Sequence, residues 1–188
     1  MKTLTKDKLL ELLEWAMVIF VVSNMSAYGF GKVVQFGTLS DSQKTLAELK
    51  PMQLMWAFYG HSKSYAIILG AFEVLGSLLF ILPKTRILGG FLLSGILINI
   101  ILQDYFYEVL FGALIAAMFY QFLICIVLFL NRKTIINGVK SLVVQKPFAF
   151  EGNKLISVFL IFILLIIIYF SNNLLFILKK KKKIQYLF

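Results

Sequence analysis

Glu73 is the residue with the clearest potential for chemistry, because it is a carboxylic acid inside the apolar sequence GAFEVLGS. An ionised carboxylate at the middle of a bilayer is costly, so we expect this side chain to face other helices and find a partner. Ala66, Gly70 and Ser77 share its helical face, and small residues there let a second helix approach closely. Two interpretations remain open: Glu73 fixes helix register by packing and hydrogen bonding, or it handles a ligand or a proton.

Other apolar segments also carry stripes of polar or small residues at helical spacing. Such stripes indicate a single helix bundle with a polar seam between its helices. The amides could form interhelical hydrogen bonds, worth about 0.6 kcal/mol each, or the seam could bind a small solute. The predicted seam consists of Asn24, Tyr28, Lys32, Glu73, Asn99, Gln103 and Gln121.

A second candidate cluster is predicted at the outer membrane face, where His61, Asp104, Tyr107 and Glu108 should come near Lys32. A lysine favours the charged form of neighbouring carboxylates, and a histidine exchanges protons near neutral pH. The cluster could therefore be a small-molecule or proton site. It could equally be a solvated rim of weak ion pairs.

Metal and nucleotide chemistry have no recognisable motif in this sequence. One histidine and one cysteine, His61 and Cys125, cannot form a structural zinc site or a bis-histidine haem site. Walker, GxGxxG, HExxH and CxxC motifs are absent from the sequence. Any redox chemistry would need a borrowed cofactor such as a quinone, or a partner subunit.

Composition shows what must position these residues. The 188 residues are 60% hydrophobic and only 15% charged, too few charges to cover a soluble surface. We predict an all-α polytopic membrane protein with apolar segments at about 12–30, 65–82, 87–102, 109–130 and 155–178. The proline-containing turn at 83–86 forces its two flanking helices to be antiparallel. The expected fold is an antiparallel four-helix transmembrane bundle plus a fifth hydrophobic helix.

Three regions follow from this pattern: a membrane core at 1–133, a cytoplasmic amphipathic connector at 134–153, and the fifth helix with a polylysine tail at 154–188. Residues 37–54 form the predicted outer loop. Positive residues of the first four helices favour a cytoplasmic N-terminus, whereas Lys179–Lys183 would break that rule if the fifth helix spans. The net charge of +10 lies at the ends of apolar segments, which indicates anionic lipid headgroups and not nucleic acid as partners.

The sequence resembles the DoxX-like family of small bacterial membrane proteins, over roughly residues 15–130. The resemblance is carried by four blocks in order: YGFGKVVQF at 28–36, LMWAFYGHSKSY at 54–65, GAFEVLGSLLFILPKTRILGG at 70–90, and the segment 99–109. The glycine-flanked glutamate followed by the proline-basic turn and LGG is the most specific block. The fifth helix and its lysine tail lie outside the resemblance.

The resemblance implies a four-helix core in the bacterial cytoplasmic membrane. Some members are associated with the membrane subunit of thiosulfate:quinone oxidoreductase, and others with complexes that handle thiol or oxidative stress. It therefore implies a subunit or accessory protein of a quinone-linked redox or sulfur-handling complex, with a quinone and a partner subunit but no metal of its own. The matched candidates are Tyr28, Lys32, Trp56, Glu73, Arg86, Asn99 and Tyr107.

The sequence departs from the family at 103–109, where a proline is missing and Glu108 replaces an aspartate. The missing proline puts the outer-end geometry and any shared activity in question. Two alternatives stay open beside the redox subunit: a non-catalytic membrane scaffold, and a small-solute or proton carrier through the seam around Glu73.

Overall fold

The computed structural model describes residues 5–36, 45–143, 156, 158–167 and 169–170. The chain divides into two compact units, Met1–Lys140 and Ser141–Phe188. In the second unit the described part includes a short apolar helix, Val158–Ile167, within the predicted fifth segment. The predicted ends of that segment and Lys179–Lys183 lie outside the described residues. The remaining elements are α1 Lys6–Gln35, the 3-10 turn η1 Leu46–Glu48, α2 Pro51–His61, α3 Lys63–Ile81, α4 Arg86–Phe106, α5 Phe111–Leu130 and α6 Arg132–Val143.

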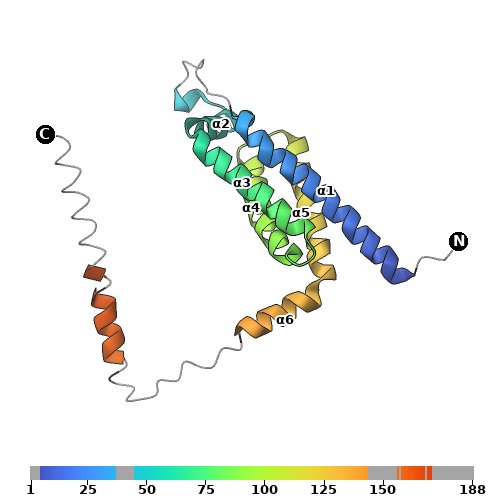
Figure 1. The fold of residues 1–188 in the computed structure, drawn as a ribbon. Helices are drawn as coiled ribbons and strands as arrows, with labels where there is room; N and C mark the ends of the chain where they lie inside the picture. The colour runs from blue at the N-terminus through green and yellow to red at the C-terminus, as the bar shows by residue number, and fades with distance from the viewer. Residues whose placement is uncertain (1–4, 37–44, 144–155, 157, 168, 171–188) are drawn as a thin grey trace. The chain divides into compact units, whose positions relative to one another are not determined.

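The helices α1, α3, α4 and α5 pack side by side as a bundle, in which α3 and α5 both contact α1 and α4 (Figure 1). Successive long helices run antiparallel. Arg86 at the start of α4 bonds Glu14 near the start of α1, and Gln103 near the end of α4 bonds Tyr59 just before α3. By length and composition each of these four helices could cross a membrane. The prediction of an all-α chain with four such helices is confirmed for the described residues.

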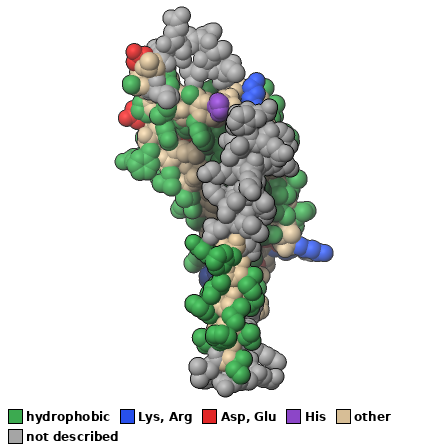
Figure 2. All heavy atoms as spheres, turned by 90° about the vertical axis from the view of Figure 1, so that its left-hand side faces the viewer, with side chains coloured by type: hydrophobic (Ala, Val, Ile, Leu, Met, Phe, Trp, Pro, Cys, Tyr) green, Lys and Arg blue, Asp and Glu red, His purple; other side chains and the backbone are tan. Residues whose placement is uncertain are grey.

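The bundle is apolar inside and outside. Its core is filled by fully buried side chains from all four helices, including Val21, Phe80, Leu93 and Ile124. The outer faces carry large apolar side chains as well, and Figure 2 shows hydrophobic side chains over the visible flank of the bundle with charged ones toward its ends. Phe30 and Phe72 are 67% and 46% exposed, for example. A soluble monomer rarely exposes so much contiguous apolar surface.

Two helix limits differ from the predicted ones. Helix α1 extends from Lys6 to Gln35 and not only over the apolar residues 12–30. Its polar first turns are exposed, and near its other end Lys32 is buried against α3. The predicted outer loop does not reach residue 54, because α2 already begins at Pro51. Proline suits the first helical position, and the Gln53 side chain accepts the backbone N–H of Lys50 at 3.1 Å, closing the helix start.

The connection that the sequence places at 134–153 contains α6, whose apolar side chains Ile136, Val139 and Leu142 are 49–73% exposed. The described helix carries both apolar and lysine side chains, and the cytoplasmic amphipathic connector stays a prediction. Residues 144–153 lie outside the described part of the chain, so the proposed limits of the three regions stay a prediction.

A glycine contact sets the distance between α1 and α3. A Cβ atom added to Gly29 would lie 2.7 Å from the backbone oxygen of Gly70, and one added to Gly70 would collide with the backbone oxygen of Gly29. Backbone atoms cannot move aside as a side chain can, so only glycine permits this approach. The small-residue face predicted for α3, which includes Ala66, Gly70 and Ser77, is buried as expected.

We expect Gly70→Ala to lower the free energy of unfolding by about 1–3 kcal/mol, because the methyl group forces α1 away from α3. Gly112→Ala is the matched control, since Gly112 is a helical glycine with open space around it. It should be neutral or slightly stabilising. Unfolding in mixed micelles with increasing dodecyl sulfate, followed by circular dichroism, measures both variants. Equal stability of the two would contradict the close helix contact.

Candidate functional site

A cavity of about 570 Å³ lies in the half of the bundle where α1 ends and α3 begins. Its volume falls in the range of about 300–1,000 Å³ that is usual for small-molecule sites. Aromatic side chains from the residue after α1 and from α2, α3 and α4 contribute much of its wall: Phe36, Trp56, Tyr59, Tyr65 and Phe91. The polar lining comprises Tyr28, Lys32, Gln35, Glu73, Asn99, Gln103 and Asp104. Cavities with apolar walls and a few convergent polar groups are typical of binding sites.

A buried ion pair forms part of this wall. Lys32 Nζ lies 3.3 Å from Glu73 Oε1, and the two side chains are only 11% and 1% exposed. The glycine contact between α1 and α3 explains the pairing. A Cβ on Gly70 would touch Lys32 Cβ at 3.1 Å, and one on Gly29 would touch Glu73 Cβ at 3.2 Å. Each charged residue therefore packs on the glycine of the opposite helix.

The second carboxylate oxygen of Glu73, Oε2, is buried and has no hydrogen-bond partner among the described residues. Buried polar atoms are usually satisfied, so an orphaned acceptor in a cavity wall marks a place where a donor from a ligand or water would be stabilised. One oxygen of Glu73 pairs with Lys32 across α1 and α3, and the other is an acceptor in the cavity wall. Both interpretations of its role therefore stay open.

A row of phenol and amide groups runs along another part of the wall. The Tyr59 hydroxyl donates to Gln103 Oε1 at 2.6 Å, and Gln103 Nε2 donates to Asn99 Oδ1 at 2.6 Å. Burial raises the pKa of Tyr59 above its ordinary value, against the smaller opposing effect of its bond to Gln103. The phenol therefore stays protonated at neutral pH and keeps this row oriented from α2 to α4.

The predicted polar seam is divided by the structure. Tyr28, Lys32, Glu73, Asn99 and Gln103 line the cavity, whereas Asn24 and Gln121 do not. Asn24 Oδ1 accepts the Tyr120 hydroxyl at 3.1 Å and joins α1 to α5. Gln121 Nε2 donates to Ser94 Oγ at 3.1 Å and joins α5 to α4. These two amides serve helix packing.

The outer-face residues do not gather in one place. Asp104 is buried, lines the same cavity as the Lys32–Glu73 pair and interacts electrostatically with Lys32. His61 and Tyr107 line a separate, open hollow of about 690 Å³ beside Phe58. Glu108 is exposed in the turn between α4 and α5, with φ at 51°. Among the four, only Asp104 belongs to the cavity that holds the ion pair.

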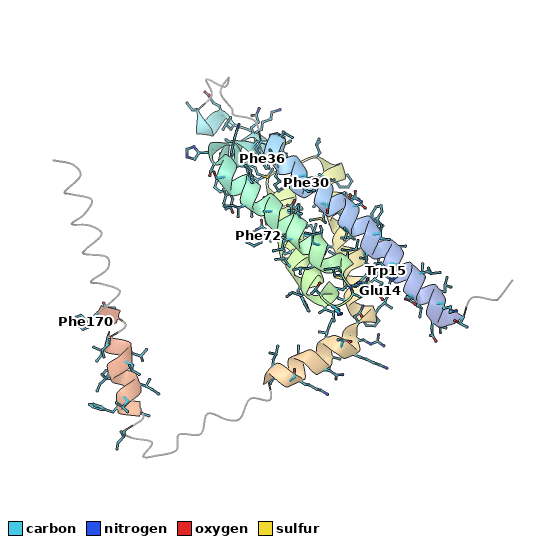
Figure 3. The ribbon with its side chains drawn as sticks, viewed as in Figure 1. Glu14, Trp15, Phe30, Phe36, Phe72 and Phe170 are labelled. Atoms are coloured by element: carbon cyan, nitrogen blue, oxygen red, sulfur yellow. The ribbon has the colours of Figure 1, made fainter. Side chains whose placement is uncertain are left out.

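Sequence reasoning missed a charged network at the opposite end of the bundle. Glu14 Oε1 accepts hydrogen bonds from Arg86 Nη1 at 2.7 Å and from Asn131 Nδ2 at 2.9 Å. The Arg86 guanidinium also lies over the Trp15 ring, 4.3 Å from its centroid. Figure 3 shows Glu14 and Trp15 far along α1 from Phe36. Glu14, an acidic residue within the predicted apolar segment 12–30, was the available signal. The network connects α1, α4 and the end of α5.

Within the part of the chain that the structure describes, His, Cys, Asp and Glu side chains do not gather in any group of three that could hold a metal ion. The polar groups of the cavity are instead one ammonium, two carboxylates, amides and phenols. Such groups recognise carbonyl and hydroxyl functions.

The described residues thus define a helical protein with four helices of membrane-spanning length and a cavity that holds a buried ion pair. No family model matches the chain, and no solved structure matches it. A segment of 93 residues is 32% identical to the uncharacterized protein YwoB of Bacillus subtilis (strain 168). The match covers 48% of this chain and 60% of YwoB, and that name states no activity. The resemblance to the DoxX-like family stays a prediction.

Proposed function

We propose that this chain is a multi-pass protein of the bacterial cytoplasmic membrane, of DoxX-like type, whose cavity binds a quinone. In this proposal it serves as a membrane subunit or accessory protein of a quinone-linked redox or sulfur-handling complex. The observation that carries the proposal is the buried Lys32–Glu73 pair in the wall of a ligand-sized cavity. An intramembrane ion pair is costly to keep and is by default a functional-site hypothesis.

Membrane placement is supported by the apolar outer faces of the bundle. Lys84, Arg86, Arg132 and Lys133 lie at the end where α4 begins and α5 ends, which favours that end, and the N-terminus with it, on the cytoplasmic side. Helix α6 carries exposed apolar side chains together with Lys133 and Lys140. That combination suits anionic lipid headgroups at the membrane surface.

The residues of the cavity fit a quinone. A quinone ring presents two carbonyl acceptors, which the Lys32 ammonium and the amide nitrogen of Asn99 could bind as donors. The reduced form presents hydroxyl donors, and Glu73 Oε2 is a buried acceptor that lacks one. Trp56 in the cavity wall offers an aromatic ring for stacking, whereas the Tyr59 ring is already stacked on Phe36. When bound, a quinone supplies reversible two-electron, two-proton redox chemistry.

The chain's own residues hold and orient such a ring. Lys32 donates at one position while Glu73 keeps its charge compensated and offers an acceptor beside it. The Tyr59–Gln103–Asn99 row fixes the direction of the amide groups, because each acceptor in the row already receives a hydrogen bond. Asp104 adds negative potential near Lys32.

Passage of a solute through the whole bundle is less well supported than binding in the cavity. Between the Lys32–Glu73 pair and the Glu14–Arg86 pair, the interior is filled by apolar side chains that include Val21 and Phe80, both fully buried. A carrier would have to open this layer. This packing favours binding in the cavity over passage through the bundle.

Quenching of Trp56 fluorescence tests the proposal, because the chain has only two tryptophans. Trp56 lines the cavity, whereas Trp15 packs on Arg86 at the other end of the bundle. In the Trp15→Phe protein in lipid nanodiscs, we expect a benzoquinone with a decyl tail to quench Trp56 along a saturable curve. In the Trp56→Phe protein, quenching of Trp15 should rise linearly, as for random encounters in the bilayer. Linear quenching of both residues would refute quinone binding in the cavity.

A further inference from the structure

The walls of the cavity are closed to different degrees. Between α1 and α3 the backbones touch at Gly29 and Gly70, which leaves no room for a guest to pass. The wall formed by α4 is open instead. Phe91, Gly95 and Asn99 follow one another at helical spacing, all three line the cavity, and all three are exposed. A residue that both lines a cavity and is exposed on the bundle surface lies at an opening.

Gly95 has free space in front of it, unlike the other glycines of this helix pair. A Cβ atom added to Gly95 would meet no atom of the described residues within 4 Å. A Cβ added to Gly89 would collide with the backbone of Phe80, and one added to Gly76 would lie 2.7 Å from Leu93 Cδ2. Helices α3 and α4 therefore pack tightly near their connecting turn, whereas the surface of α4 at Gly95 is open.

We propose that Gly95 marks a lateral entrance, through which a lipid-borne ligand with a polar ring and a single alkyl tail enters the cavity from the bilayer. This inference rests on the proposed function and adds to it the route and the shape of the ligand. The surface around Gly95 is part of the outer flank of α4, where Phe91 is 52% exposed, Ile98 is 52% exposed and Leu102 is 50% exposed. An apolar flank of this kind faces lipid when the bundle spans a membrane.

A ligand bound at Gly95 would have its ring and its tail in two different environments. The ring would reach the polar groups of the cavity, where Asn99 stands one turn from Gly95 and the Lys32–Glu73 pair lies deeper. The tail would lie over Gly95 beside Phe91 and continue into the hydrocarbon.

The test compares equilibrium binding of two quinones, a tail-free dimethoxybenzoquinone and its decyl-tailed derivative, by quenching of Trp56 in the Trp15→Phe background. We expect Gly95→Phe to weaken binding of the tailed quinone at least about tenfold, because the aromatic ring fills the path of the tail. Binding of the tail-free quinone should change by less than about threefold. Gly112→Phe is the matched control, since Gly112 is also an exposed helical glycine with open space around it but does not line the cavity.

The outcomes separate the two proposals. If neither quinone quenches Trp56 saturably in the parent protein, the proposed function fails and the entrance fails with it. If the parent binds but Gly95→Phe binds the tailed quinone as tightly as the parent does, the entrance is refuted alone. An equal loss for both quinones also refutes it, because Gly95 would then contact the ring. Gly95→Leu, a smaller change with good helix propensity, decides the question if Gly95→Phe does not fold.

Discussion

Lys32→Met is expected to lower the free energy of unfolding by about 3–5 kcal/mol, the usual cost of removing one partner from a buried ion pair. Glu73 is 1% exposed and its Oε2 already lacks a partner, so the substitution leaves a buried carboxylate without a countercharge. Glu73→Gln should cost less, because Lys32 is 11% exposed and still interacts with Asp104. Unfolding in mixed micelles with increasing dodecyl sulfate, followed by circular dichroism, measures these differences.

The double variant Lys32→Met/Glu73→Gln is the matched control. It removes both charges, so it should recover most of the stability that Lys32→Met loses, as replacement of whole buried pairs often does. A loss below about 1 kcal/mol for Lys32→Met would be the behaviour of an exposed ion pair. That result would show that the pair is not buried between α1 and α3.

Arg86→Met is the second substitution with a large expected effect, a loss of about 3 kcal/mol. Arg86 holds Glu14 at 2.7 Å, lies over Trp15 and reaches the backbone oxygen of Phe80 at 3.4 Å. Without it, Glu14 keeps only its bond to Asn131 at this end of the bundle. The same unfolding titration measures the loss.

Arg86→Lys should restore little of this stability, since an ammonium cannot both stack on the indole and bond two acceptors as a planar guanidinium does. Arg132→Met is the control at the same end of the bundle. Arg132 is exposed and its replacement should change stability by less than about 0.5 kcal/mol. Full stability of the Arg86→Lys protein would show that the positive charge alone, and not the planar guanidinium stacked on Trp15, holds α1 to α4.

Much of the fold could be predicted because a membrane-spanning helix needs a long apolar segment, and such segments are visible without tertiary information. The segments predicted at 65–82, 87–102 and 109–130 correspond to α3, α4 and α5 within a few residues. The limits of α1 were less accessible. Its polar first turns lie exposed beyond the apolar segment, and its last turns contact α3 through Lys32. Hydrophobicity alone shows neither extension.

The burial of Glu73 could also be predicted, because its neighbours at helical spacing are small. Its partner could not. The sequence placed Lys32 both in the polar seam with Glu73 and near the outer-face cluster, so it did not single out this pair, which depends on the crossing of α1 and α3 at Gly29 and Gly70. The register between two helices is a tertiary property that a single sequence does not display.

Two further features have the same cause. Glu14 and Arg86 are 72 positions apart, and their pairing follows only from the placement of α1 beside α4. The cavity receives Trp56 and Tyr59 from α2, a helix that begins inside the segment 37–54 predicted as the outer loop. Its Pro51 start was the local signal for a helix.

The measurement that tests the central claim most directly is the titration of Trp56 fluorescence with a decyl-tailed quinone in two proteins, Trp15→Phe and Trp15→Phe/Lys32→Met/Glu73→Gln. The second protein keeps the cavity and the reporter but lacks the charges of the ion pair. We predict saturable quenching in the first protein and affinity at least about tenfold weaker in the second. Equal affinity in both proteins would contradict the claim that the Lys32–Glu73 pair forms the binding site.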